Sequence, residues 1–159
     1  MKNITRTCVV LASVFSASAH ADLYFGIKAG SMLIGFDDVE VAEDPASVAG
    51  TLGYQFESFP SLSVEAEVSR TVSTGLVVGN ELEVESQGVY FSYTSPGRIY
   101  YKGRIGYMDA ALVAGDLSED EGGETYGVAV GIRLQGVSVE LDYTAVDDDV
   151  NFVSIGLRF

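Results

Sequence analysis

After residue 22 the chain alternates apolar side chains with polar or small ones through most of its length. The clearest stretch covers residues 62–72, where Leu62, Val64 and Val68 share one parity and Glu65 and Glu67 share the other. Alternation with a period of two predicts β-strands with one apolar and one polar face. Apolar residues at a sustained helical spacing do not occur after residue 21. We therefore expect an all-β protein.

Eight alternating segments are separated by turn-forming or acidic stretches. The predicted strands cover residues 23–33, 48–56, 62–72, a segment that ends near Tyr93, 98–108, 126–134, 137–145 and 150–159. The connections after the second, fourth and sixth segments are short, at residues 57–61, 94–97 and 135–136. The others are mostly longer, at residues 36–47, 73–82, 109–124 and 146–149. This arrangement predicts one domain, an eight-stranded antiparallel up-and-down barrel with short turns at one end and long loops at the other.

The last strand stops on an aromatic residue. Its apolar parity carries Val153, Ile155, Leu157 and Phe159. A strand at the edge of a sheet has unpaired backbone groups, and a closed barrel removes this edge by pairing the last strand with the first. The ending therefore favours a closed barrel over an open sheet.

Alternation alone does not distinguish a transmembrane barrel, which is apolar outside, from a soluble lipocalin-like barrel, which is apolar inside. The strand glycines favour one of them, because only Gly50 and Gly103 lie on the apolar parity. Eight lie on the polar parity: Gly26, Gly30, Gly53, Gly88, Gly106, Gly127, Gly131 and Gly156. The lumen of an eight-stranded barrel is barely wide enough for side chains and needs small residues beside large ones. We therefore predict that the polar face points inward and that the barrel spans a membrane.

The charges on the polar parity are nearly balanced. Five are basic (Lys28, Lys102, Arg104, Arg133 and Arg158) and four are acidic (Glu65, Glu67, Glu140 and Asp142). An enclosed space of low dielectric constant requires such a balance, because an unpaired buried charge is costly. We predict that these residues form a salt-bridge network that fills the lumen. The alternative is an ordinary charged face in contact with solvent.

The first 21 residues have the pattern of a secretory signal peptide. Lys2 and Arg6 precede an apolar stretch at residues 8–15, and Ala19-His20-Ala21 forms a small-x-small cleavage site. The apolar stretch is much shorter than the roughly 20 residues of a membrane-spanning helix, which argues against an N-terminal anchor. We expect cleavage before Asp22, so that residues 22–159 form the mature barrel domain.

The predicted mature chain contains neither cysteine nor histidine, because Cys8 and His20 lie in the signal peptide. Ser-His-Asp and Cys-His catalysis and histidine-based zinc sites are therefore excluded. If the protein were an enzyme, its catalytic groups would have to be carboxylates, lysines or tyrosines. We expect a non-enzymatic protein without a cofactor.

The mature chain would contain 23 acidic and seven basic residues. Seventeen acidic residues lie in or directly beside the four long connections, namely Asp37, Asp38, Glu40, Glu43, Asp44, Glu81, Glu83, Glu85, Asp109, Asp116, Glu119, Asp120, Glu121, Glu124, Asp147, Asp148 and Asp149. This composition excludes nucleic acid as a partner, because phosphate binding requires basic patches. Three interpretations of the acidic residues stay open. They make the loops soluble, they keep the protein hydrated in a saline habitat, or they bind divalent cations weakly together with lipopolysaccharide phosphates. The acidic runs lack the spacing of an EF-hand, so the sequence leaves a metal site undetermined.

The segment YFSYTSPGRIYYKGRIGY at residues 90–107 and the terminal strand resemble the OmpA/OmpX-type small outer-membrane β-barrels of Gram-negative bacteria. The resemblance extends over residues 22–159. It implies an outer-membrane location, contact with membrane lipid and lipopolysaccharide, and a lumen that is blocked or gated by paired charges. It also implies that the barrel assembly machinery reads the terminal strand through Phe159. The third residue from the end, often aromatic in that family, is Leu157 here.

Taken together, these features predict an outer-membrane barrel with a structural or surface-interaction role, a charge-plugged lumen and acidic external loops. A narrow, porin-like ion pore is the second interpretation. A soluble periplasmic lipocalin-like barrel that binds a ligand is the third. The sequence does not identify a surface partner or an oligomeric state.

Overall fold

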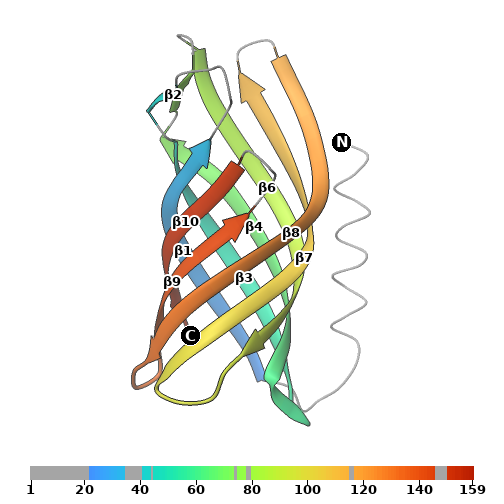
Figure 1. Ribbon diagram of the computed structural model, residues 1–159, viewed down its shortest axis with the longest axis vertical. Coiled ribbons are helices and arrows are strands. Elements are labelled where there is room, and N and C mark those ends of the chain that lie inside the picture. The colour runs from blue at the N-terminus through green and yellow to red at the C-terminus, as the bar shows by residue number, and fades with distance from the viewer. Residues whose placement is uncertain are drawn as a thin grey trace.

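The computed structural model describes residues 22–34, 41–43, 45–73, 75–77, 80–114, 117–145 and 150–159. Eight antiparallel strands form a closed barrel (Figure 1). In ring order they are β1 (Asp22–Ile34), β3 (Ala46–Phe56), β4 (Phe59–Ser73), β6 (Asn80–Thr94), β7 (Ile99–Ala114), β8 (Leu117–Arg133), β9 (Ser138–Ala145) and β10 (Val150–Arg158). The predicted eight-stranded up-and-down barrel is confirmed. The proposed signal peptide lies outside the described residues.

The ring closes between the first and last strands. The register of β1 and β10 runs from Gly26 opposite Arg158 to Ile34 opposite Val150. Beyond this ladder, Phe25 N donates to Phe159 O at 3.3 Å, and Phe159 N donates to Phe25 O at 2.9 Å. The two phenylalanine rings stack with their centroids 4.9 Å apart. The last strand is thus paired on both edges, as the sequence pattern predicted.

The short turns lie together at one end of the barrel, here called the turn end. Phe56 pairs with Phe59, so only two residues connect β3 with β4. Gly97 and Gly136 lie in the β6–β7 and β8–β9 turns with φ of 112° and 78°. Glycine adopts this left-handed region without steric cost, which explains its position in both tight turns.

The opposite end, here called the loop end, differs from the prediction. Residues 109–124 were expected to form a long loop, but β7 continues to Ala114, β8 begins at Leu117, and these two residues pair. The short strands β2 (Val41–Glu43) and β5 (Gly75–Val77) lie within two other predicted loops and extend the sheet beside β6. Backbone pairing does not require alternating side chains, so the period-two pattern gave no sign of this extension. Figure 1 shows β7 and β8 rising above the barrel at this end.

The two faces of the strands have the predicted orientation. Ile105 and Leu141 on the apolar parity are 66% and 55% exposed. Glu65 and Arg104 on the polar parity are 0% and 3% exposed. The polar face therefore lines the lumen, as the glycine pattern indicated, and the apolar face covers the outside.

Candidate functional site

The lumen brings eight of the nine predicted charged residues into two adjoining layers, here called the charge network. The strands β1, β4, β7, β9 and β10 contribute these side chains, which meet at the middle of the barrel because their strands are held in a fixed register. The network has four cations and four carboxylates: Lys28, Lys102, Arg104 and Arg158 with Glu65, Glu67, Glu140 and Asp142. Its formal charge is therefore zero.

The upper layer, toward the loop end, is a four-membered ring of charges. Arg104 Nη1 lies 2.6 Å from Glu67 Oε2, and Arg104 Nη2 lies 3.1 Å from Asp142 Oδ1. Lys28 Nζ contacts the same two carboxylates at 3.0 Å and 3.2 Å. Thr51 donates a hydrogen bond to Glu67, and Thr144 donates one to Asp142. Each carboxylate thus meets both cations and a hydroxyl, which compensates for its removal from water.

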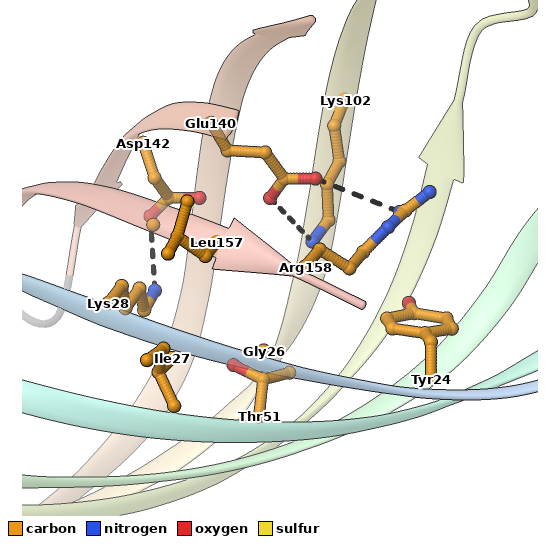
Figure 2. Close-up of a pocket in the computed structure, with 11 residues that line it drawn as sticks. Tyr24, Gly26, Ile27, Lys28, Thr51, Lys102, Glu140, Asp142, Leu157 and Arg158 are labelled. Atoms are coloured by element: carbon orange, nitrogen blue, oxygen red, sulfur yellow. Dashed lines mark hydrogen bonds and ion pairs between the residues drawn. The ribbon is translucent and has the colours of Figure 1, made fainter. Parts of the chain in front are cut away.

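The lower layer lies nearer the turn end. Lys102 Nζ is 2.6 Å from Glu65 Oε1 and 3.7 Å from Glu140 Oε2. Arg158 Nη1 is 3.7 Å from Glu140 Oε1, so this carboxylate lies between two cations, as Figure 2 shows. Arg104 joins the layers, because its Nη1 lies 4.0 Å from Glu65 Oε2.

Arg133 was predicted in the same network, but it lies apart from it. Its guanidinium donates to the backbone carbonyls of Gly97 and Ser95 in the β6–β7 turn. It also lies over the Tyr100 ring, 4.2 Å from the ring centroid. Among the described residues no carboxylate forms an ion pair with it. Arg133 holds the turn at the base of the barrel, and the remaining charges balance without it.

Three inward-facing tyrosines complete the site and were missed in the sequence. Tyr24 donates to Glu65 Oε1 at 2.5 Å, and Tyr100 donates to Glu140 Oε1 at 2.6 Å. The centroid of the Tyr90 ring lies 4.3 Å from the guanidinium carbon of Arg104. Their position on the polar parity of their strands was the available signal. Small neighbours make room for them: a Cβ on Gly53 would lie 2.1 Å from the Tyr24 ring, and one on Gly131 would lie 2.4 Å from the Tyr100 ring.

A second group of lumen residues, also missed, is apolar. The apolar cluster, as we call it, consists of Met32, Ala49, Val84, Tyr90, Met108, Val150 and Phe152. Met32 lies four residues beyond Lys28 on β1, and Met108 lies four residues beyond Arg104 on β7, both toward the loop end. Met32 also pairs with Phe152. Most of the apolar cluster thus lies on the loop side of the charge network, beside buried hydroxyls such as those of Ser47 and Thr71.

The predicted assembly residues lie on the outer face. Ile155, Leu157 and Phe159 are 61%, 39% and 47% exposed, and Val153 is half-buried. Other large apolar side chains surround the barrel at similar exposure, including Phe25, Tyr101 and Tyr126. A belt of this kind is suited to lipid and unsuited to water, because large exposed apolar surfaces are rare on soluble monomers.

The acidic connections lie mostly outside the described side chains, among them Asp37, Asp38, Asp147, Asp148 and Asp149. Within the described part of the chain, no group of three potential metal ligands comes together. Across the same residues, no helix has the length and apolar character needed to cross a bilayer.

Searches of protein-family models and of curated proteins found no match to this chain. Solved structures do match. Neisserial surface protein A is 14% identical with a TM-score of 0.58, over 87% of this chain and 97% of that one. Ail of Yersinia pestis, in complex with the heparin analogue sucrose octasulfate, is 14% identical with a TM-score of 0.59, over 88% and 99%.

The outer membrane protein OprG from Pseudomonas aeruginosa gives the same picture. It is 13% identical with a TM-score of 0.60, over 88% of this chain and 97% of that one. Nearly the whole of each neighbour is covered, so the likeness extends to the complete barrel. At these identities the likeness concerns the fold, and it agrees with the outer-membrane location predicted from the sequence. The chain has the fold of the small eight-stranded outer-membrane β-barrels.

Proposed function

We propose that this chain is a non-enzymatic outer-membrane barrel with a structural or surface-interaction role and a lumen closed by its own charges. The observation that carries the proposal is the pairing of four cations with four carboxylates inside the barrel. A catalytic or transport site would require accessible charges, whereas these charges contact one another. The barrel then acts as a rigid support for the acidic connections at its loop end.

The narrow-pore alternative is disfavoured by the filling of the lumen. The small cavity beside the charge network has a volume of about 20 Å³ and is lined by Tyr24, Gly26, Lys102 and Gly156 among others (Figure 2). This is room for about one water molecule. A hydrated ion would have to separate the charge network to pass. The lipocalin-like alternative is disfavoured by the apolar outer face.

The loop end limits the class of surface partner. Among the described loop-end side chains, Glu85, Asp109 and Glu124 are acidic, and Arg70 is paired with Glu85 at 3.3 Å. Ail was crystallised with a polyanion. We propose no such ligand for this chain, since its long connections carry many acidic residues and neither lysine nor arginine. Cationic surfaces, or divalent cations shared with lipopolysaccharide phosphates, fit this charge better.

The proposal includes the maturation of the chain. Residues 1–21 are removed on export, Asp22 becomes the first residue, and Phe159 is read by the barrel assembly machinery. Membrane fractionation together with heat-modifiable gel mobility tests location and fold at once. The mature protein is expected in the outer-membrane fraction, with a mobility that changes on boiling.

Deletion of Phe159 is expected to cause degradation or periplasmic accumulation, because it removes both the terminal aromatic and its contact with Phe25. Phe159→Tyr keeps the ring and serves as the matched control, which should reach the membrane. Intact wild-type protein in the soluble periplasmic extract would overturn the proposal. Large, stable open channels of the wild-type protein in planar bilayers would instead favour the porin-like alternative.

A further inference from the structure

The inner surface of the barrel changes character along its axis. From the turn end to the upper layer of the charge network it is polar. Beyond that layer lie the apolar side chains of Met32, Val84, Met108, Val150 and Phe152, beside buried hydroxyls that are hydrogen-bonded to one another, such as Ser47 with Thr71 and Ser69 with Ser86. Met32, Val84 and Phe152 of the apolar cluster are 1–2% exposed. Arg158 and Glu140, nearest the turn end, have side chains that are 16% and 12% exposed, against 2% for Arg104. Contact with water is therefore retained at the turn end.

Several polar atoms in the polar half have no hydrogen-bond partner within the described protein. They are Glu65 Oε2, Ser92 Oγ, Arg104 Nε and Ser154 Oγ, and all four residues are at least 96% buried. Buried polar groups of folded proteins are nearly always hydrogen-bonded, to protein or to internal water. A carboxylate oxygen left without any partner would be especially costly.

Three of these atoms come from one side of the lumen. Ser92 lies on β6 between Ser63 of β4 and Arg104 of β7 in the strand register. Glu65 Oε2 and Arg104 Nη1 are 4.0 Å apart, too far for a direct hydrogen bond and close enough for one water molecule to bridge them. On the opposite side, the cavity at Gly26 and Gly156 offers space for another water.

We infer that the lumen is a blind, hydrated vestibule that opens at the turn end and is sealed at the loop end by the apolar cluster. Water enters from the turn end and satisfies the unpartnered atoms of Glu65, Ser92 and Arg104. Met32 and Phe152, which pair across β1 and β10, form the part of the seal that is truncated below. The inference rests on the membrane-spanning barrel of the proposed function and adds to its charge network a second barrier, the apolar cluster, on the loop side.

The sequence allows a clean test by cysteine accessibility, because its single cysteine is Cys8 and residues 22–159 contain none. A Ser92→Cys variant of the mature protein is inserted in oriented vesicles. Ag⁺, a small thiol-reactive cation, is added from one side at a time, and the thiols left unblocked are counted with a maleimide dye after unfolding. We expect blocking to be about tenfold or more faster from the turn side, since an apolar layer opposes the entry of an ion.

Truncating the seal should reduce this asymmetry. Phe152→Ala in the Ser92→Cys background is expected to raise the loop-side rate by about tenfold, since it removes part of the apolar barrier on that side. Met32→Ala is a second, independent truncation should the first variant fail to fold. Phe91→Ala makes the same change on the outer face, where Phe91 is 46% exposed, and should leave the asymmetry intact.

Equal rates from both sides in the Ser92→Cys protein would overturn the inference, as would no reaction from either side. A loop-side rate that neither seal truncation raises would also overturn it. A protein that does not enter vesicles at all would contradict the proposed function, which is a different result from an inserted barrel with symmetric access.

Discussion

The inward and outward faces of the same strands differ in how closely neighbours determine each side chain. On β7 and β9, Arg104 and Asp142 point inward and contact each other at 3.1 Å, and each also contacts other members of the charge network. Ile105 and Leu141, next to them in the sequence, point outward and need only to be apolar. The stability of the inner face therefore depends on specific pairs of side chains. The outer face requires only that its side chains be apolar on average.

The largest effect is expected from breaking an inner pair. Arg104→Ala would leave Glu67 and Asp142 with Lys28 as their remaining close cation, and should lower the free energy of unfolding by roughly 3–5 kcal/mol. Arg70→Ala is the matched control, because Arg70 pairs with Glu85 in an exposed position. It should cost less than about 1 kcal/mol. Urea unfolding in lipid vesicles measures both, and equal losses would mean that the inner pairs are not specific.

A somewhat smaller effect is expected from a charge on the outer face. Leu141→Arg places a cation in lipid and should cost roughly 2–4 kcal/mol if Leu141 lies near the membrane midplane. The same change at Leu134, which is exposed in the β8–β9 turn, should cost at most about 1 kcal/mol. Unfolding free energies of the two variants give the comparison. A harmless Leu141→Arg would place the outer face in water.

The smallest effect is expected from adding one methyl group to either face. Gly131→Ala directs its Cβ against the Tyr100 ring and should cost roughly 1–3 kcal/mol through overpacking. Gly103→Ala directs its Cβ outward, where no atom lies within 4 Å, and should be nearly neutral. Thermal unfolding of the two variants side by side measures the difference. A larger loss for Gly103→Ala would contradict the assignment of faces.

The sequence predicted the strand number and the closed ring from the period-two pattern, and the orientation of both faces from the parity of the strand glycines. It did not predict that β7 and β8 continue to Ala114 and Leu117, since backbone pairing does not require alternating side chains. It also missed Tyr24 and Phe152, which lie on the polar parity but fill the lumen with rings. Parity gives the direction of a side chain, while its depth and partners depend on three-dimensional register.

Arg133 illustrates the same limit within the site. Its parity and charge placed it with the other lumen cations, but its height along β8 puts it beside the β6–β7 turn, where carbonyl oxygens accept its hydrogen bonds. The charge pattern therefore identified the inward face correctly, but it assigned Arg133 to the charge network in error. Arg158, the last residue of β10, also lies near the turn end, but its guanidinium lies 3.7 Å from Glu140, so height alone does not separate the two arginines.

The seam between Phe25 and Phe159 has a consequence for how the barrel folds. Seven of the eight interfaces in the ring join strands that follow each other along the chain, apart from the short β2 and β5. The eighth joins β1 to β10 and closes a loop of nearly the whole barrel. Contacts between residues far apart in sequence carry a large entropic cost and form slowly. The ring should therefore close last, and until it does β1 and β10 present two open strand edges to any other chain nearby.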